Sequence, residues 1–253
     1  MYRILLVLML FCSHAFADQV LKSQQSKDDA NSEPLHVSGG LGYYKYTEPD
    51  LMDITGGYVQ IDADKIISKY ADGSFYAVEG GLTYVNGHYS SFGTGEMDND
   101  VSWILRGEAS YGYSWDQYSA TSGFGIRYLS NDTAGRQSTT GYTGYLREQW
   151  YWYVPVRFVY QQPLSQGHAW SAGVGTNIFL SGKNISLNNE FHQSEGWHLN
   201  GFAAYEWDNY FVKALVDYWY VDNSTIDCSG GSCFIEPQND TLQFGVHIGM
   251  SIR

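Results

Sequence analysis

The chain has 253 residues and a formal net charge of −13 at pH 7, from 14 basic and 27 acidic residues, so it is a poor candidate for binding nucleic acid. The 22 tyrosines, 8 tryptophans and 28 glycines favour a chain with membrane–water interfaces, because soluble secreted sandwiches seldom need so many interfacial aromatic residues.

Residues 1–17 have the pattern of a secretory signal peptide. Arg3 begins it, an apolar run continues to Phe11, and Ala15-Phe16-Ala17 forms a small-x-small cleavage site. The run is about half as long as the roughly 20 residues that a membrane helix needs, and no later stretch approaches that length. Residues 18–35 are polar and aperiodic, which predicts a flexible periplasmic leader.

From residue 36 onward, apolar side chains recur at alternate positions in ten separate segments. Period-2 alternation predicts β-strands, and many of the segments reach the roughly 9 to 11 residues with which a tilted strand crosses a bilayer. The expected strands are 36–46, 57–67, 75–86, 101–113, 120–129, 145–160, 169–180, 197–207, 210–221 and 241–252.

The segment 145–160 shows the alternation most strongly. One parity carries Trp150 and Trp152 among large apolar groups, and the other carries Arg147 and Arg157. A strand with lipid on one side and a polar lumen on the other has this pattern. Pro155 lacks an amide proton, so we expect a bulge or irregular pairing there.

The connections between these segments alternate between long and short through the whole series. Together with the signal peptide and the dyad repeat, this arrangement resembles the small bacterial outer-membrane β-barrel proteins over residues 36–253. The resemblance implies an all-β, antiparallel, up-and-down transmembrane barrel, most simply of ten strands, with eight or twelve as alternatives. It further implies residence in the outer membrane, contact with its lipid and lipopolysaccharide, and recognition by the barrel assembly machinery. The chain departs from the class at Ser251-Ile252-Arg253, where such barrels usually end in an aromatic residue.

The alternation assigns side chains to the two faces of the wall. We expect lipid-facing aromatic residues at Trp103, Tyr111, Trp150, Trp152, Trp170, Trp197, Trp207 and Tyr218. We expect a lumen cluster of charged and titratable residues at Arg106, Glu108, Arg127, Arg147, Arg157, His198, Glu206, Lys213 and Asp217. This cluster either lines a pore or pocket, or fills the lumen with mutual salt bridges, and the second reading is favoured because a barrel this small is nearly filled by its own side chains.

Two loop segments have patterns that recur in binding sites. Cys228 and Cys233 in CSGGSC predict a disulfide that closes a short loop, since a zinc site would need two further ligands and none has a matching spacing. Glu96, Asp98 and Asp100 alternate as in calcium loops, but the glycine and glutamate that such loops require are absent. We expect a solvated loop there, with a weak cation site facing lipopolysaccharide phosphates as the alternative, and we predict no metal site or cofactor.

His192 and Ser194, with Glu206 downstream, look like the His-x-Ser arrangement of outer-membrane lipid A deacylases, although Glu195 stands where that family has asparagine. The acidic and Asp-His pairs of the ten-stranded omptin proteases have no match in this chain. We therefore expect a non-enzymatic outer-membrane protein with surface loops for interaction or envelope integrity. The alternatives are a small channel with a charged lumen and a lipid hydrolase that uses His192 and Ser194.

Overall fold

A computed structural model describes residues 33–187, 189–229 and 232–252. The predicted signal peptide, and the predicted leader as far as residue 32, lie outside these residues. No helix among the described residues is long and apolar enough to cross a membrane.

The elements are β1 (Leu35–Glu48), β2 (Met52–Lys69), β3 (Ser74–Ser91), β4 (Gly95–Trp115), β5 (Tyr118–Asp132), β6 (Leu146–Pro163), the 3₁₀ turn η2 (Ser165–Gly167), β7 (His168–Ser186), β8 (Asn189–Gln193), β9 (Gly196–Trp207), β10 (Tyr210–Val221), β11 (Asp227–Ser229), β12 (Ser232–Phe234) and β13 (Asn239–Ile252).

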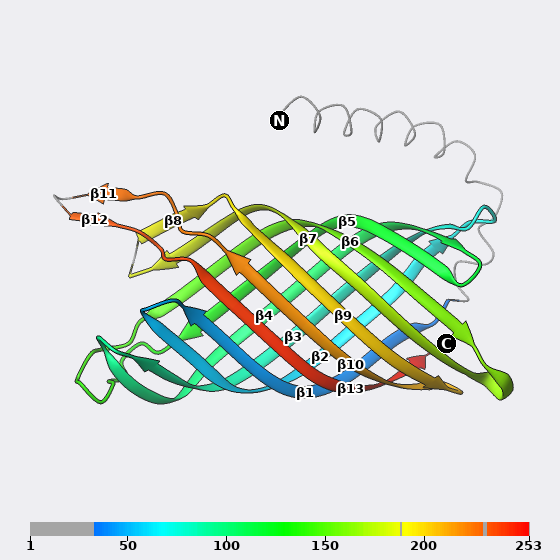
Figure 1. The fold of residues 1–253 in the computed structure, drawn as a ribbon, viewed down its shortest axis with the longest axis horizontal. Helices are drawn as coiled ribbons and strands as arrows, with labels where there is room; N and C mark the ends of the chain where they lie inside the picture. Colours follow the sequence, from blue (N-terminus) through cyan, green and yellow to red (C-terminus); the bar gives the residue numbers. More distant parts are fainter. Residues whose placement is uncertain (1–32, 188, 230–231, 253) are drawn as a thin grey trace, which may run out of the picture.

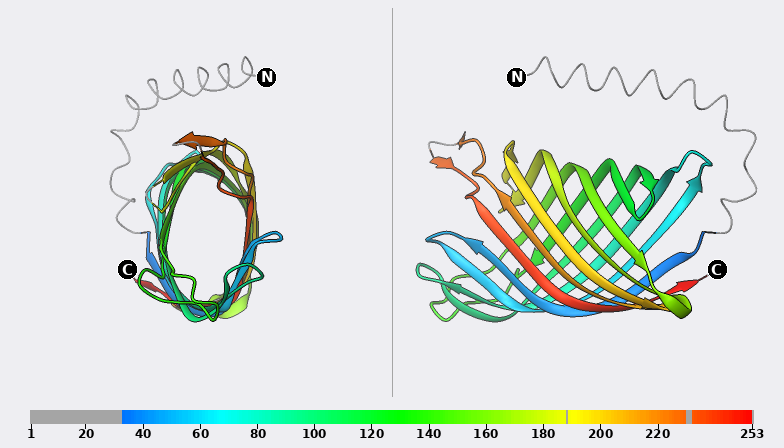
Figure 2. Two further views of the ribbon diagram at one scale, coloured as in Figure 1. Left: turned by 90° about the vertical axis from the view of Figure 1, so that its left-hand side faces the viewer. Right: turned by 45° about the vertical axis from the view of Figure 1, so that its right-hand side comes forward.

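Ten long strands form a closed antiparallel barrel, as the sequence predicts. Their order is β6-β5-β4-β3-β2-β1-β13-β10-β9-β7, and β6 pairs with β7 to close the ring. The strands are strongly tilted and wind around a common axis (Figure 1), and the view along that axis shows the ring of strands (Figure 2). Closure leaves none of the ten strands with an unpaired edge.

The start of β1 and the end of β13 lie at one end of the barrel, which we call the terminus end (Figure 1). The first residue of β1, Leu35, pairs with Ile252 near the end of β13. The connections at this end are confined to residues 70–73, 116–117, 164–167 and 208–209. An even number of strands with short turns at the terminus end is the arrangement that the sequence predicts.

At the opposite end, which we call the mouth end, the strands extend much further than expected. The segments 47–56 and 87–100 were expected to be long loops, but β2 begins at Met52, β3 continues to Ser91 and β4 begins at Gly95. The prediction was wrong here because it ended each strand where the apolar alternation stops. Backbone pairing continues beyond that point, where both faces of the hairpins carry polar residues.

The aromatic residues that were assigned to the lipid face all point away from the lumen. Trp103, Tyr111, Trp170 and Trp197 are exposed on the outer wall. The other four, Trp150, Trp152, Trp207 and Tyr218, are half-covered by aromatic neighbours. Trp150, for example, has its ring centroid 4.4 Å from that of Tyr128 and 6.4 Å from that of Trp152. These contacts form an aromatic outer surface of the kind that meets lipid.

The wall is irregular near Pro155. Its pairing with β5 is interrupted at Val154 and Pro155, between Ser122↔Val156 and Gly125↔Tyr153. On the β7 side, a bulge shifts the register between Trp152 and Tyr153. The interruption has a simple cause, because proline offers no N–H to the ladder.

Candidate functional site

A layer of buried tyrosines fills the middle of the lumen. Tyr44 and Tyr46 project from β1, while Tyr151 and Tyr153 project from β6, which stands opposite β1 in the ring. None of the four side chains is more than 2% exposed. We call these four residues the tyrosine layer. They occupy the inward positions of the period-2 alternation, so their burial within the barrel means that they pack against other lumen side chains.

Apolar and aromatic neighbours complete this layer. Tyr44 and Tyr46 belong to a buried cluster with Leu129 of β5, and Tyr151 and Tyr153 belong to a second cluster with Trp219 of β10. The sequence analysis treated the lumen as a polar compartment and did not single out these residues, although strand parity places them inward. The centre of the barrel is therefore a packed core.

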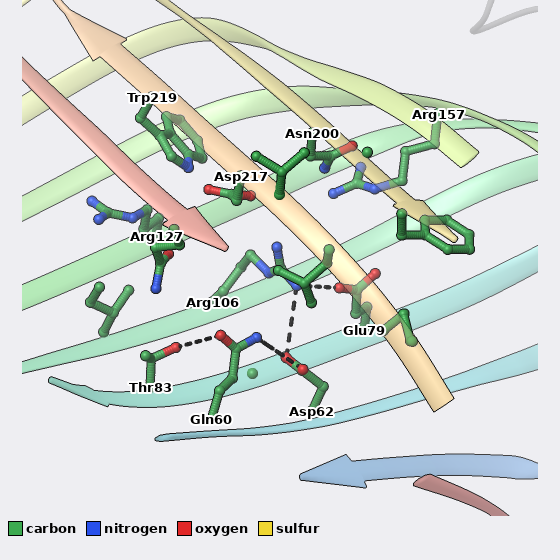
Figure 3. A pocket seen from close by; sticks show the side chains of 18 of the residues that line it. Gln60, Asp62, Glu79, Thr83, Arg106, Arg127, Arg157, Asn200, Asp217 and Trp219 are labelled. Atoms are coloured by element: carbon green, nitrogen blue, oxygen red, sulfur yellow. Dashed lines mark hydrogen bonds and ion pairs between the residues drawn. The ribbon is translucent and has the colours of Figure 1, made fainter. Parts of the chain in front are cut away.

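A cavity of about 150 Å³, which we call the inner cavity, lies in the lumen on the terminus side of the tyrosine layer. Figure 3 shows Asp62, Glu79 and Arg106 among the residues that line it. Arg106 Nη2 lies 2.5 Å from Glu79 Oε1 and 3.8 Å from Asp62 Oδ1. Arg157 Nη2 lies 2.7 Å from Glu108 Oε1. Arg106, Glu108 and Arg157, which were predicted to face the lumen, thus form ion pairs within it, the kind of contact that the salt-bridge interpretation expects.

Aromatic rings close the mouth side of the inner cavity. The Arg127 guanidinium lies 5.5 Å from the ring centroid of Tyr151 and 5.6 Å from that of Trp219, and the two centroids are 6.0 Å apart, so the cation contacts both neighbouring rings from one side. His198 Nε2 lies 2.8 Å from Asp217 Oδ2, and the His198 ring packs at a tilt against Trp219, with the ring centroids 4.3 Å apart. Because Arg127 reaches from β5 to β10, these contacts cross the lumen.

The remaining predicted lumen residues take no part in these contacts. Lys213 lines the inner cavity but forms no ion pair with any described residue. Glu206 lies near the terminus end, where it accepts hydrogen bonds from Ser171 Oγ at 3.3 Å and from Gln161. Arg147 lies at the other end, beyond the tyrosine layer. The predicted cluster therefore occupies three levels of the barrel.

The mouth end contains a larger cavity of about 400 Å³, which we call the mouth cavity. Its lining combines apolar and aromatic side chains with hydroxyl and amide groups and with the charged residues Glu48, Asp50, Asp100 and Arg147, and a mixed lining of this kind suits a small organic ligand. The apolar lining residues are Leu51, Met52, Tyr89, Phe92, Met97 and Tyr142, and the polar ones include Ser91, Thr94, Asn131, Thr133 and Ser138.

A buried charge network lies at the mouth end of the lumen. Arg147 Nη1 lies 2.5 Å from Glu48 Oε1, and Arg147 Nε lies 3.9 Å from Glu236 Oε1. Tyr46 contributes its hydroxyl group, which donates to Glu48 at 2.9 Å and accepts from Arg147. Asn184 Nδ2 donates to Glu236 Oε1 at 2.5 Å. The network ties β1, β6, β7 and the segment before β13 to one another.

Glu236 is buried in the lumen but lies in the connection between β12 and β13 and not on a wall strand. Burial raises the pKa of its carboxyl group to about 7, and the negative charge of Glu48 adds to this increase. Arg147 and the hydrogen bond from Asn184 act in the opposite direction. Glu236 can therefore gain or lose a proton near neutral pH.

Four acidic partners of the predicted arginines were not assigned from the sequence. Asp62 and Glu79 face Arg106, while Glu48 and Glu236 face Arg147. Strand parity contained the signal for Asp62 and Glu79, since both occupy inward positions of their strands. Glu236 has no such signal, because it lies in a connection with no alternation.

The three acidic residues that resemble a calcium loop do not share one face. Asn99 adopts a positive φ of 55°, and the β3–β4 register shifts between Gly87 and Tyr89. This bulge leaves Asp98 outside, 2.8 Å from His88 Nδ1, and turns Asp100 inward, where Asn131 donates to it. Among the described residues, no group of three His, Cys, Asp or Glu side chains is placed to hold a metal ion.

His192 and Ser194 of the hydrolase alternative are both exposed and two residues apart in the chain, but Glu206 lies far from them. His192 on β8 is opposite Lys183, whereas Glu206 on β9 is opposite Ala169, fourteen residues away along β7. At roughly 3.3 Å per residue this separation is about 45 Å, so Glu206 does not orient His192. His192 Nε2 instead lies 3.3 Å from Glu190 Oε1.

Cys228 and Cys233 face each other on the paired strands β11 and β12. The two residues form a disulfide, with their Cα atoms 4.0 Å apart. This small hairpin lies beyond the barrel wall at the mouth end (Figure 1). The bond fixes the connection that also carries Glu236.

No protein-family profile and no curated protein matches this sequence. The structure is similar to the outer membrane protease OmpT from Escherichia coli, with a TM-score of 0.51 and 7% identity over 87% of this chain and 97% of that chain. The chain has the fold of an outer-membrane β-barrel protein. Other similar barrels are the Neisserial surface protein A (TM-score 0.37, 7% identity, 86% of this chain and 97% of that chain) and the Pseudomonas putida toluene transporter TodX (TM-score 0.35, 9% identity, 87% and 67%). At these identities the likeness extends to the fold alone, and the activity of this outer-membrane β-barrel has to be argued from its own residues.

Proposed function

We propose that this chain is a non-enzymatic protein of the bacterial outer membrane, with a lumen closed by its own side chains and a mouth end that faces the outside of the cell. Its outer loops and mouth cavity serve interaction or envelope integrity. Lipid and lipopolysaccharide surround the wall, and the barrel assembly machinery inserts it after export by the signal peptide.

The observation that carries this proposal is the tyrosine layer. Tyr44, Tyr46, Tyr151 and Tyr153 are almost fully buried between the mouth cavity and the inner cavity. A continuous water-filled path would expose at least part of these side chains. Their burial therefore supports a closed barrel over a small channel.

The mouth end supports the interaction role. Phe92 is fully exposed at the tip of the β3–β4 hairpin, and Ile226 and Phe234 are exposed beside the disulfide-closed hairpin. Exposed apolar side chains beside a cavity are a common feature of binding surfaces. The separation of His192 from Glu206 gives no support to the hydrolase alternative.

Single-cysteine labelling on intact cells with a membrane-impermeant maleimide tests both orientation and closure. The introduced thiol is the reactive one, because Cys228 and Cys233 are paired. We expect Phe92→Cys at the mouth end to be labelled on intact cells. Asn209→Cys, in the turn between β9 and β10 at the terminus end, should be labelled only after the outer membrane is permeabilised.

Lys213→Cys in the inner cavity provides the test of closure. We expect no labelling of this variant on intact cells. Labelling comparable with that of Phe92→Cys would show an open lumen and contradict the proposal. Labelling of Asn209→Cys on intact cells would contradict the orientation.

A further inference from the structure

The inner cavity contains more hydrogen-bond donors than its own acceptors satisfy. Arg127 is 3% exposed, and its Nη2 has no acceptor among the described residues. Gln243 is 7% exposed, and its Nε2 also has none. Both residues line the inner cavity, and both of the unpartnered nitrogen atoms carry N–H groups that can donate a hydrogen bond. A buried donor without an acceptor has a large desolvation cost.

Arg127 also lacks a negative charge that would compensate its own. Arg127 and Arg106 stand directly opposite each other in the β4–β5 ladder, where like charges repel. Arg106 is compensated by Glu79 and Asp62. Arg127 has no carboxylate within ion-pair distance among the described residues and touches two aromatic rings instead.

The acidic residues of the cavity are already engaged. Asp217, which pairs with Gln243 across β10 and β13, lies 2.8 Å from His198 Nε2. Asp62 accepts two hydrogen bonds from Gln60, in addition to its contact with Arg106. Lys213 adds a further cation to the lining without an ion-pair partner in the part of the chain that the structure describes. With His198 neutral, the cations Arg106, Arg127, Arg157 and Lys213 balance the acids Asp62, Glu79, Asp217 and Glu108, so the cavity is distinguished by the unpaired guanidinium of Arg127 and not by an excess of charge.

We propose that the inner cavity is a binding site for a small oxyanion, a phosphate or a carboxylate group, held by Arg127 and Gln243. The guanidinium fork matches the geometry of such groups, and a buried charge-assisted hydrogen bond is stronger than a neutral one. The volume of about 150 Å³ limits the ligand to a small anion. Lys213 also attracts the anion, but it is not assigned as a direct ligand. It lies four residues from Asp217 on β10, and Asp217 is the residue that pairs with Gln243.

Isothermal titration calorimetry on the refolded full chain in detergent, in chloride-free buffer at constant ionic strength, tests the site. The probes are sodium phosphate and sodium acetate in separate titrations. We expect saturable binding of at least one of them with one site per chain. The probe that binds with the higher affinity indicates whether the natural ligand carries a phosphate or a carboxylate group.

Arg127→Met should weaken this binding at least tenfold, and Arg127→Lys should weaken it less because the charge remains. The matched control is Lys45→Met, which removes one cation from the outer wall and should bind as the unmodified chain does. Circular dichroism establishes that each variant is folded. If Arg127→Met does not fold, Arg127→Lys and Gln243→Leu replace it in the titrations, and we expect each to bind the anion with reduced affinity. Absence of saturable binding to the unmodified chain, or unchanged affinity in a folded variant at residue 127, would overturn the proposal.

Discussion

Arg147 on β6 and Glu48 on β1 join opposite walls of the barrel through a contact of 2.5 Å between Nη1 and Oε1. Both side chains are buried, and the hydroxyl of Tyr46 bonds to each of them. The pair thus braces the lumen at its mouth end, directly beside the tyrosine layer.

Removal of Arg147 should be strongly destabilising, because it leaves Glu48 buried without a partner. For Arg147→Met we expect the free energy of unfolding to fall by about 3–5 kcal/mol. Urea unfolding of the protein refolded into detergent or lipid measures this change. The control is Lys183→Met, which removes the exposed pair with Glu190 and should cost about 0–1 kcal/mol. Equal losses in the two variants would contradict the bracing role of Arg147.

Gly125 on β5 provides the space for the ring of Tyr153. A Cβ atom at this position would lie 2.2 Å from Tyr153 Cε2, so the ring would have to move. We expect Gly125→Ala to lower the free energy of unfolding by about 1–3 kcal/mol. Gly107→Ala on β4 is the control, since its nearest neighbour would be Ile126 Cγ2 at an ordinary 3.9 Å. A Gly125→Ala protein as stable as Gly107→Ala would show that Tyr153 is loosely packed.

The connection that carries Glu236 should become less stable as pH rises. The pKa of Glu236 is raised from its ordinary value of 4.5 to about 7, so the folded connection favours the protonated carboxyl. This contribution is fully present below about pH 4.5 and is lost as pH rises through about 7. Amide hydrogen exchange of residues 222–238, compared between pH 5 and pH 8 after correction for intrinsic exchange rates, should show lower protection at pH 8. Glu236→Gln should remove most of this difference, and an unchanged pH dependence in that variant would assign it to another group.

Reduction of the disulfide should loosen the small hairpin and leave the barrel unchanged. Cys228 and Cys233 close a short loop, so the bond contributes about 2 kcal/mol in the chain-entropy model. Limited proteolysis should cleave β11 and β12 faster in the Cys228→Ser/Cys233→Ser double variant. The ten long strands should stay resistant to protease, and their cleavage would show that the barrel itself depends on the bond.

Period-2 alternation was sufficient to predict the ten strands and the two faces of the wall. The segment 210–221 was predicted with the boundaries that the structure gives to β10. Segment 87–100 failed because strand pairing beyond the bilayer needs no apolar face. The bulge at Asn99, which turns Asp100 inward, also has no counterpart in the alternation.

Contacts across the lumen could not be predicted in the same way. Parity states that Arg127 and Trp219 both point inward, but it does not state that one reaches the other from the opposite wall. That contact depends on barrel diameter and on the height of each residue along its tilted strand. The same limit applies to Arg147 and Glu48, which are 99 residues apart in sequence.

Planar-bilayer recording of the refolded, unmodified chain tests most directly whether the tyrosine layer closes the lumen. The account predicts no discrete conductance steps. It also predicts that the Tyr151→Ala/Trp219→Ala double variant, which removes two rings from the packed centre, produces such steps. Discrete conductance of the unmodified chain that changes on Arg106→Ala or Arg147→Ala would contradict the closed-barrel account and identify a channel.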